Sequence, residues 1–368
     1  MDKQLLDKII DLAVVIQQIP APTFFEHQRG DFIRGRFLAE GLSNVSLDSI
    51  GNVYGCLPGG GRIQPVVVSA HMDSVFPAST ELYVVRNEDK IVGPGIGDNA
   101  AGLAALFGLL WVLRMREIQL PGDVWFVANV GEEGVGDLQG MQAVVNRFEN
   151  HAQAYLVVEG MALGQVYHQG LAVRRYRIRV ETAGGHSWVN FGFPSAIHEL
   201  AALVTHLVGI PLPKKPRVTL NVGLISGGIS VNTIAAEASI ELDLRSEDEK
   251  WLSRLSGRVE ELVQKADRES VHASAQIIGQ RPPGSIPVDH PLVHLAKSCL
   301  EAQGIQPHLN IGSTDANIPL SRGLPAVCVG ITTGNGAHTT HETIQTQPFN
   351  QGIAQLADLV EGAFSLSK

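Results

Sequence analysis

The amino-acid sequence predicts an α/β fold with a smaller α+β domain inserted into it, and three observations support this class. Short β-branched runs at residues 65–70, 123–130 and 154–158 alternate with segments of helical spacing. These runs are almost entirely apolar, which is typical of strands in a sheet that is covered by helices on both faces. The pattern changes near residue 170 and resumes after residue 283, so we expect one domain to interrupt the other.

The outer domain in this prediction comprises residues 1–169 and 284–368. Its helices are predicted from apolar residues at helical spacing, and its strands from apolar β-branched runs. Helices are expected at residues 5–16, 27–42, 98–115 and 292–302 and from about 351 onward, with a further strand at 326–330. A chain of 368 residues, at roughly 150 residues per domain, is long enough for two domains.

The inserted domain comprises residues 170–283. Its first segment, residues 171–182, alternates apolar residues with arginines, which predicts a strand with one solvent-exposed face. The following elements are a helix at 195–208, strands at 218–225 and 233–244, an amphipathic helix at 248–267 and a strand at 271–278. The order β-α-β-β-α-β is the ferredoxin-like pattern.

The composition narrows the class of partner. The chain has 28 Lys and Arg residues against 37 Asp and Glu, a net charge of −9 with neutral His. This balance disfavours nucleic acid and anionic membrane surfaces as partners. The 13 His residues suggest a supply of metal ligands in an acidic chain.

The cysteines and the N-terminus indicate the cytoplasm. Cys56, Cys299 and Cys328 are widely spaced and form no C-x-x-C motif, which fits a reducing compartment and disfavours a disulfide framework. The first residues mix charges at once, so we expect no signal peptide. No membrane span is expected either, because the longest uncharged apolar segment, residues 100–113, is shorter than the ~20 residues that a span needs.

The first segment with ligand-type residues follows the apolar run at 65–70. His71 and Asp73 are two residues apart, so their side chains project from the same side of a strand. One of them can bind a metal ion while the other accepts the second imidazole N–H. The alternative is a capped strand end with a hydrogen-bonded histidine.

A glycine-rich loop at residues 93–100 places Asp98 at a predicted helix start. Asp98 is either an ordinary helix N-cap or a ligand. A loop that cradles phosphate is a third interpretation. However, the spacing is G-x-G-x-G rather than G-x-G-x-x-G, and no Walker lysine follows, so the loop is weak evidence for a nucleotide.

Two adjacent carboxylates, Glu132 and Glu133, follow the apolar run at 123–130 and are surrounded by glycines. Like charges side by side raise one pKa, and burial raises both. A metal ion resolves this conflict for one carboxylate and leaves the other free to act as a base near neutral pH. A solvated acidic turn is the alternative, but Lys or Arg would then be expected in place of the glycines.

Further carboxylates and imidazoles complete the set. Glu159 ends a third apolar run, and strand-end carboxylates of an α/β sheet face the crevice where ligands bind. The glycine-rich loop at 334–342 adds His338, His341 and Glu342, although alone it could be a surface loop. Oxygen donors with a few imidazoles suit Zn²⁺, Mn²⁺ or Co²⁺. Two ions that share a bridging carboxylate would suit hydrolysis of amides or phosphoesters.

These segments resemble the M20 family of metallopeptidases, which includes aminoacylases, carboxypeptidase G2-like enzymes, succinyl-diaminopimelate desuccinylase and tripeptidase T. The motifs run in family order from residue 71 to 342, and Pro20 to Thr23 with Glu26 looks like the family's N-terminal segment. The matching stretches are His71-Met72-Asp73, Gly97-Asp98-Asn99, Gly131-Glu132-Glu133, Glu159, Gly184-Gly185-His186-Ser187, Asn232, Gly312-Ser313-Thr314-Asp315 and Ala337-His338-Thr339-Thr340-His341-Glu342. The resemblance implies a di-metal exopeptidase-like catalytic domain with a mixed sheet covered by helices, and an inserted ferredoxin-like domain that acts as a lid and often dimerises.

The resemblance also implies a ligand set for two divalent metal ions, with zinc favoured over cobalt or manganese. Asp98 would bridge the ions. His71 and Glu159 would complete one site, and Glu133 and His338 the other. His338 is chosen over His341 because the family ligand lies four residues before the glutamate, here Glu342.

The same resemblance assigns the remaining roles. Glu132 would be the general base and acid, and Asp73 would orient His71. His186 would polarise the scissile carbonyl, in its own chain or across a dimer, and Asn232 and Arg245 would contact a substrate carboxylate. Taken alone, His186 would more often be a structural strand-end histidine and Arg245 a solvated side chain.

We therefore expect a zinc-dependent cytoplasmic exopeptidase that cleaves short peptides as a homodimer. Residues 338–342 and the Ser-Thr-Asp segment look like tripeptidase T, whereas residues 71–77 and 93–98 look like the carboxypeptidase G2 branch. Free-N-terminus peptides are thus the first expectation and N-acyl amino acids the alternative. A non-catalytic binder of peptides or metal is disfavoured by Glu132, and a dinucleotide enzyme by the glycine spacing.

Overall fold

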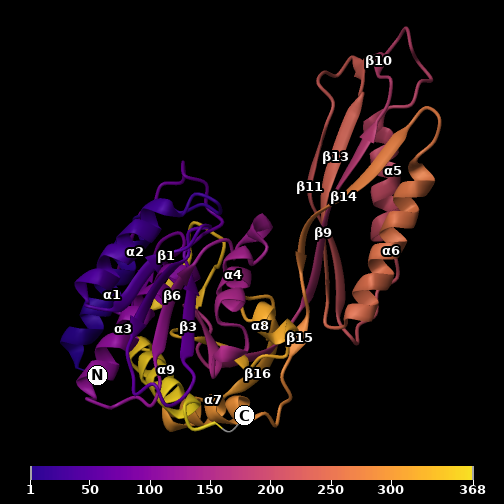
Figure 1. Ribbon diagram of the computed structural model, residues 1–368. Helices are drawn as coiled ribbons and strands as arrows, with labels where there is room; N and C mark the ends of the chain where they lie inside the picture. The colour runs from indigo at the N-terminus through magenta and orange to yellow at the C-terminus, as the bar shows by residue number, and fades with distance from the viewer. Residues whose placement is uncertain (1, 367–368) are drawn as a thin grey trace. The chain divides into compact units, whose positions relative to one another are not determined.

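The computed structural model describes residues 2–366, which divide into two compact units. The first unit consists of Met1–Gly170 and Gly284–Lys368, and the second of Leu171–Pro283. Each unit has a hydrophobic core of its own. Figure 1 shows the helices and strands of each unit.

The first unit is built on a large mixed sheet with the strand order β1-β2-β6-β3-β7-β17-β8-β15, to which β16 is added beside β8. The central strands β6, β3, β7 and β17 are parallel, and antiparallel pairs occur toward both edges. The strands are β1 (Ser43–Leu47), β2 (Val53–Leu57), β3 (Val66–His71), β6 (Val124–Asn129), β7 (Ala154–Glu159), β8 (Gln165–Gly170), β15 (Gly284–Ser285), β16 (His308–Gly312) and β17 (Ala326–Gly330). The predicted α/β class with a mixed sheet is confirmed.

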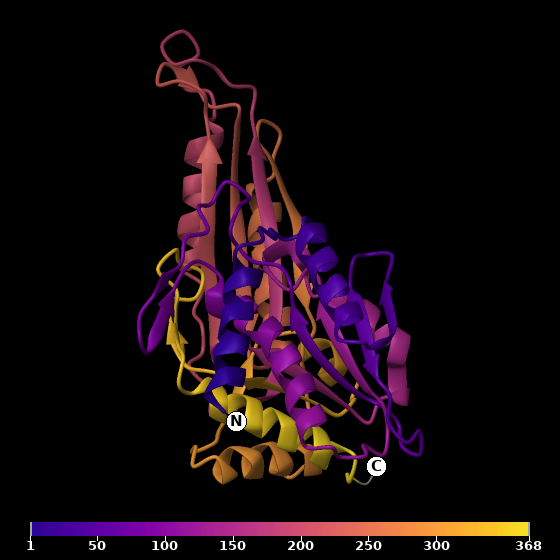
Figure 2. The same cartoon turned by 90° about the vertical axis from the view of Figure 1, so that its left-hand side faces the viewer.

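Helices cover both faces of this sheet. Two successive residues of β6 point to opposite faces: the ring of Phe126 lies 6.5 Å from that of Phe37 in α2, and the ring of Trp125 lies 5.4 Å from that of Phe148 in α4. On the α2 face, α1, α3, α9 and α7 pack side by side (Figures 1 and 2). The helices are α1 (Lys3–Gln17), α2 (His27–Ala39), α3 (Gly102–Met115), α4 (Gln139–Phe148), α7 (Pro291–Ala302), α8 (Asn317–Ser321) and α9 (Phe349–Ala363).

The most apolar helical segment is Ile96–Met115, which comprises the π-helical turn η1 (Ile96–Ala101) and α3. Its length and composition would allow it to cross a membrane, but 94% of its 18-residue apolar window is buried inside the protein. Burial of this kind is typical of a helix in the core of a folded domain. The sequence placed the start of this helix at Asp98, whereas η1 begins two residues earlier, and Asp98 itself has the non-helical angles φ −113° and ψ 87°.

A small antiparallel sheet brings the C-terminal loop to η1. Its strand order is β18-β19-β5-β4. The strands are β4 (Val85–Arg86), β5 (Lys90–Val92), β18 (Gly334–Asn335) and β19 (Thr343–Gln345). Thr343 pairs with Val92, and Gly93 donates its N–H to the carbonyl of Glu342 at 2.9 Å. The loop between β18 and β19 therefore lies beside the start of η1.

The second unit contains an antiparallel sheet with the order β11-β13-β9-β14 and a two-stranded pair, β10-β12. Two helices, α5 and α6, pack on one face of the larger sheet, against buried residues such as Tyr176 and Leu242. The elements are β9 (Ala172–Glu181), β10 (Gly185–His186), α5 (Ala196–Val208), β11 (Val218–Gly227), β12 (Thr233–Ile234), β13 (Glu237–Ser246), α6 (Glu249–Ala266) and β14 (His272–Arg281). The longer elements follow one another as β-α-β-β-α-β.

Several elements differ from those that the sequence predicts. The helix expected at residues 27–42 ends at Ala39, because the chain turns at Gly41 (φ 67°) and continues into β1. Strands β1, β2 and β8 and helix α4 were not predicted. In β8, half-buried and buried residues alternate along the strand. Polar residues such as Gln165 and His168 occupy both kinds of position and interrupt the apolar pattern on which the prediction depends.

Candidate metal centre

The predicted ligands converge on one edge of the large sheet. His71 is the last residue of β3, Glu159 is the last residue of β7, and Glu133 follows the end of β6. These three strands are neighbours and run parallel, so their carboxyl ends meet at the same edge. Asp98 reaches this edge from η1, and His338 reaches it from the loop between β18 and β19.

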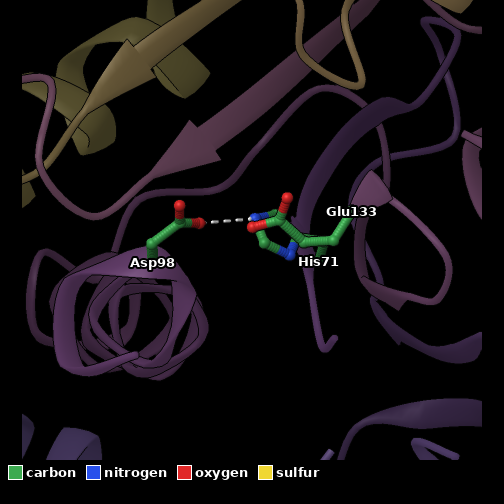
Figure 3. Close-up of side chains that lie close together, drawn as sticks. All are labelled: His71, Asp98 and Glu133. Atoms are coloured by element: carbon green, nitrogen blue, oxygen red, sulfur yellow. Dashed lines mark ion pairs between the residues drawn. The ribbon is translucent and has the colours of Figure 1, made fainter. Parts of the chain in front are cut away.

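The first ligand group consists of His71, Asp98 and Glu159. His71 Nε2 lies 3.1 Å from Asp98 Oδ1 and 3.7 Å from Glu159 Oε2. In Figure 3, the Asp98 carboxylate extends from the helical turn directly toward the imidazole. The imidazole itself is 2% exposed, so it is held within the protein rather than at its surface.

The second ligand group consists of His338, Asp98 and Glu133. His338 Nε2 lies 3.2 Å from Asp98 Oδ2 and 3.2 Å from Glu133 Oε1. Asp98 thus offers one carboxylate oxygen to each group. Glu133 also lies close to the first group, since ligand atoms of His71, Asp98 and Glu133 are all within 4.8 Å of one another (Figure 3).

The donor set fits two divalent metal ions that share Asp98. Two ligands bound tetrahedrally at about 2.0–2.1 Å from a zinc ion are roughly 3.3–3.4 Å apart. The distances between ligand atoms in the two groups are 3.1, 3.7, 3.2 and 3.2 Å. The atoms are one imidazole nitrogen and two carboxylate oxygens in each group, which are ligands that zinc, manganese and cobalt accept.

The protonation equilibria at this edge of the sheet also fit a cation site. Burial, reinforced by nearby carboxylates, raises the pKa of Glu133 and that of Glu159 to about 7. The carboxylates of Asp98 and Glu133 raise the pKa of His338 to about 10, and burial only partly opposes this. Burial also opposes charge on His71, but its carboxylate partners outweigh it and raise the pKa. The carboxylates at this edge of the sheet therefore stabilise positive charge, here on the imidazole rings of His71 and His338.

Asp73 contacts both His71 and the turn that carries the two adjacent glutamates. His71 Nδ1 lies 3.1 Å from the backbone carbonyl of Asp73 and 3.5 Å from its carboxylate. The carboxylate accepts the N–H of Glu132 at 2.9 Å and that of Glu133 at 2.8 Å. Burial opposes ionisation of Asp73, but contacts with His71 and these N–H groups prevail and lower its pKa.

Glu132 lies in the turn that also carries the ligand Glu133. Its side chain is buried, at 6% exposure. Its charge adds to the effect of burial in raising the pKa of Glu133, Glu159 and Asp315, so its carboxylate is close to all three. A buried carboxylate near the proposed metal ligands is a candidate general base.

Glu342 supports Asp98 through the backbone. Its Oε1 accepts the N–H of Gly97 at 2.6 Å and that of Asp98 at 2.8 Å. The residue is fully buried, and burial raises its pKa to about 7. The sequence predicts Glu342 as a candidate ligand, and its spacing from His338 selects that histidine over His341. In the structure, Glu342 instead holds the backbone of the loop that carries Asp98.

Sequence reasoning left two contacts near this centre unassigned. Asp315, in the Gly-Ser-Thr-Asp motif, is fully buried and accepts a hydrogen bond from Asn129 Nδ2 at 2.7 Å. His341 lies with Nδ1 2.9 Å from Tyr83 Oη, and the same hydroxyl donates to the carbonyl of Thr340 at 2.9 Å. Both contacts join residues far apart in sequence, which no local pattern encodes.

His186, in the second unit, has a defined ring orientation. Its Nδ1 accepts the backbone N–H of Trp188 at 3.2 Å and that of Val189 at 3.4 Å. Asn190 Oδ1 accepts the N–H of His186 at 2.9 Å. Since Nδ1 is an acceptor, the proton of the neutral imidazole is on Nε2, which leaves Nε2–H as a free donor direction for a ligand.

The structure brings Asn232 close to His186 but does not bring Arg245 there. Ser187 donates its N–H to the carbonyl of Asn232 at 3.0 Å, and His186 pairs with Thr233. Arg245 is near the far end of β13, eight residues after Glu237, or about 26 Å along the strand at 3.3 Å per residue. Arg245 Nε lies 2.7 Å from Asp243 Oδ2, so it forms an ion pair within its own strand.

A family model described as peptidase family M20/M25/M40 matches residues 67–362. The chain belongs to peptidase family M20. The predicted family and the predicted class of enzyme, a peptidase and hydrolase, are therefore confirmed. The match includes both ligand groups, Glu132 and the whole of the second unit.

Two relatives show the range of names among similar M20 sequences. A peptidase M20 domain-containing protein of Schizosaccharomyces pombe is 28% identical over 302 residues, which cover 77% of this chain and 70% of the relative. A protein of Arthroderma otae named "Probable carboxypeptidase" is 28% identical over 209 residues, which cover 51% of this chain and 45% of the relative.

Solved M20 structures share the fold. A tripeptidase of Staphylococcus aureus has a TM-score of 0.79 at 20% identity and covers 98% of this chain and 99% of its own. The Bacillus subtilis protein YXEP, described as a dinuclear metal-binding peptidase of the M20 family, has a TM-score of 0.71 at 15% identity and covers 100% of both chains. In this chain, the His, Asp and Glu cluster and the two ligand groups around Asp98 fit a centre for two metal ions.

Proposed function

We propose that this M20 peptidase is a zinc-dependent exopeptidase that hydrolyses short peptides with a free N-terminus, in the manner of a tripeptide aminopeptidase. The observation that carries the proposal is the position of Asp98, with one carboxylate oxygen 3.1 Å from His71 and the other 3.2 Å from His338. Zinc is favoured over manganese and cobalt because each ligand group combines an imidazole with two carboxylates at distances that suit tetrahedral coordination.

The five ligands and their neighbours have distinct roles in this proposal. His71, Asp98 and Glu159 would hold one ion, and His338, Asp98 and Glu133 the other. Two ions so held lower the pKa of a water molecule and polarise an amide carbonyl. Asp73 keeps His71 and the 132–133 turn in place through the contacts described above.

Glu132 is the proton carrier. It takes a proton from the attacking water as the water adds to the amide carbonyl, and it returns that proton to the leaving amine. His186 donates Nε2–H to the carbonyl oxygen as negative charge develops there. The backbone N–H groups that hold Nδ1 as an acceptor support this role, because they keep the proton on Nε2.

The alternative activity is hydrolysis of N-acyl amino acids or removal of a C-terminal residue. It is favoured by residues 71–77 and 93–98, which resemble the carboxypeptidase G2 branch, and by the name of the Arthroderma otae relative. Asn232, beside His186, would contact a substrate carboxylate in either activity. Arg245, which is paired with Asp243 near the far end of β13, would not reach that carboxylate within one chain. The two activities differ in which terminus of the substrate must be free.

A peptide panel separates the two activities. Metal-free protein is reconstituted with Zn²⁺, Mn²⁺ or Co²⁺ and assayed on tripeptides that are free at both ends, N-acetylated or C-amidated. Aminopeptidase activity predicts cleavage of free and amidated peptides with little cleavage of acetylated ones. Cleavage of the N-acetylated peptides without cleavage of the C-amidated ones would overturn the proposal in favour of the alternative, and Glu132→Gln is the inactive control.

The second unit is proposed as a lid and as the contact surface of a homodimer. β11 is an edge strand of its sheet, with exposed Leu224 and Ile225, and exposed edge strands can pair with another chain. Trp188 and Phe191 are 86% and 89% exposed beside His186. Size-exclusion chromatography with light scattering should give the mass of two chains; a single-chain mass at micromolar concentration would contradict the dimer.

The cytoplasm is the proposed compartment. Cys56, Cys299 and Cys328 are all buried and free, and thiols that form no disulfide fit a reducing environment. Fractionation of the source cells followed by immunoblotting tests this location. Recovery of the protein in a secreted or envelope fraction would contradict it.

A further inference from the structure

Three consecutive backbone N–H groups at the catalytic turn all donate to buried carboxylates. Gly131 N–H donates to Glu26 Oε1 at 3.1 Å, Glu132 N–H to Asp73 Oδ1 at 2.9 Å, and Glu133 N–H to Asp73 Oδ2 at 2.8 Å. These three residues include the proposed base and a proposed ligand. The position of the turn is therefore set by two carboxylates, one of which has no role in the proposed reaction.

Glu26 comes from the N-terminal segment at residues 20–26, which lies against the chain just after β3. Ser74 N–H donates to the carbonyl of Ala21 at 2.9 Å, and Pro22 forms a β-bridge with Ser74. The Glu26 side chain is 6% exposed. The segment is thus anchored beside the two residues, His71 and Asp73, that precede this bridge.

Thr23 connects the same segment to Asp73. Its hydroxyl donates to Asp73 Oδ2 at 2.9 Å, and the same oxygen accepts the N–H of Glu133. The Thr23 hydroxyl is thus a further donor that orients the Asp73 carboxylate, beside His71 and the two backbone N–H groups. Glu26 is therefore one of the two carboxylates that accept the N–H groups of the turn, and Thr23 is hydrogen-bonded to the other, Asp73.

The backbone between these two residues is strained. Phe24 has φ 74°, a left-handed conformation that bulky side chains rarely adopt. Its N–H donates to Glu26 Oε1 at 3.0 Å, and the same oxygen accepts the N–H of Gly131. Strain of this kind persists where surrounding contacts enforce it, and it is concentrated at functional sites.

A buried arginine balances the charge of this network. Arg29 is 3% exposed and donates to the carbonyl of Met72 at 2.6 Å and to that of Ile19. Burial lowers its pKa to about 10, and the carboxylates of Asp73 and Glu26 act in the opposite direction. The guanidinium therefore remains charged at neutral pH and offsets the two carboxylates.

We propose that Thr23 and Glu26 are positioning residues of the metal centre, which fix Glu132 and Glu133 by holding the backbone of residues 131–133. This inference rests on the proposed function for the part that concerns Glu132. For Glu133 it concerns the binding of a metal ion alone, so it can be tested without any substrate.

The test compares Thr23→Val and Glu26→Ala with the conservative variants Thr23→Ser and Glu26→Gln. Val removes the hydroxyl donor at nearly constant shape, and Ser restores it. Phe25→Ala is the matched control, because Phe25 is in the same segment but its side chain is 65% exposed. Thermal unfolding identifies variants that are not folded, and only folded variants are compared.

The first measurement is a titration of metal-free protein with Co²⁺, followed by its visible absorption. Thr23→Val and Glu26→Ala should change the absorption spectrum and weaken the binding of one Co²⁺ by about 10–100-fold. Thr23→Ser and Phe25→Ala should match the original protein. Identical titrations for all folded variants would overturn the inference, whatever the substrate of the enzyme is.

The second measurement is steady-state kinetics at saturating metal on a cleaved peptide. kcat should fall by about 10–100-fold in Thr23→Val and Glu26→Ala, with KM changed less than about twofold, because substrate contacts are untouched. An equal rise in KM with constant kcat would overturn the positioning role. If Glu132→Gln retains turnover, the proposed base is wrong, and the Co²⁺ titration still decides the role toward Glu133.

Discussion

The metal centre of the first unit and the corner formed by β10 and β12 in the second unit hold their side chains in contrasting ways. His71 is 2% exposed, and its partners come from β3, η1 and β7. His186 is exposed, and its ring is held by the N–H groups of the two residues Trp188 and Val189. The first arrangement depends on the whole fold of its unit, whereas the second depends on one turn.

The difference predicts how substitutions act in each region. A buried network fixes ligand positions but couples each ligand to many neighbours, so substitution of a ligand there should alter metal binding as well as turnover. A local turn at the surface can be changed without disturbing the core, so changes there should alter turnover alone. The five predictions below test this contrast, from the largest expected effect to the smallest.

The largest effect is expected for Glu132→Gln. The amide is nearly isosteric but cannot accept and return a proton, so turnover should fall by about 10²–10⁴-fold. Metal content, measured by inductively coupled plasma mass spectrometry, should stay at two ions per chain, since Glu132 belongs to neither ligand group. Turnover within tenfold of the original enzyme would contradict its role as the base.

Removal of the imidazole in His186→Ala comes next. Loss of one donor to the developing oxyanion should lower kcat by about 10²–10³-fold, while metal content and the free energy of unfolding stay unchanged. His198→Ala, an exposed histidine of the same unit, is the control and should behave as the original enzyme. A drop in metal content in His186→Ala would contradict the expectation that changes in the second unit affect turnover without affecting metal binding.

Metal affinity should depend on pH because the free ligands hold protons. The pKa of Glu133 and that of Glu159 are about 7, and that of His338 is about 10. These groups must release protons when ions bind, so the affinity for Zn²⁺ should rise with pH by about tenfold per pH unit for each proton released. Competition with a chelator at pH 6, 7 and 8 measures this slope, and a flat profile would contradict it.

The stability of the metal-free protein should depend on pH through the same groups and should fall as pH rises. All three pKa values are raised above the ordinary values of 4.5 for Glu and 6.5 for His. The folded chain therefore binds more protons than the unfolded chain, and the stabilisation is lost as pH rises through about 7 for the carboxyls and about 10 for His338. Thermal unfolding of metal-free protein between pH 5 and 10 should show this decline, and saturating Zn²⁺ should reduce it.

The smallest effect is expected for Asn190→Ala. Loss of the contact with the His186 backbone loosens the turn that holds Nδ1 as an acceptor, so the Nε2–H tautomer should be less dominant. kcat should fall by roughly tenfold, in the range of other supporting contacts. Nitrogen-15 NMR of the His186 ring reports the tautomer directly, and an unchanged ring signal together with a large loss of kcat would contradict this cause.

The sequence predicts the large features of the fold and the identity of most site residues for physical reasons. Buried parallel strands need continuous apolar runs, so β3, β6 and β7 can be predicted from the sequence. The ligand-type residues directly after these runs can then be assigned to one edge of the sheet. Strand β8 cannot be predicted in this way, because polar side chains interrupt its apolar residues. The contacts of Glu26 with Gly131 and of Glu342 with Gly97 join residues more than 100 positions apart, and no local period encodes such contacts.

The ligand groups themselves depend on this long-range geometry. The spacing of His71 and Asp73 predicts a contact between the imidazole and the carboxylate, but the additional contacts of Asp73 with residues 132 and 133 require β3 and β6 to be neighbours. His338 is placed by the pairing of β19 with β5. From the sequence, these roles rest on resemblance to a family rather than on geometry.

The central claim is that Asp98 is shared between two metal ions. Anomalous scattering at the zinc absorption edge, measured on crystals of the zinc-loaded protein, tests it directly. The account predicts two peaks about 3.5–4 Å apart, one beside His71 and Glu159 and the other beside His338 and Glu133, with Asp98 between them. A single peak, or two peaks that do not share Asp98, would contradict it.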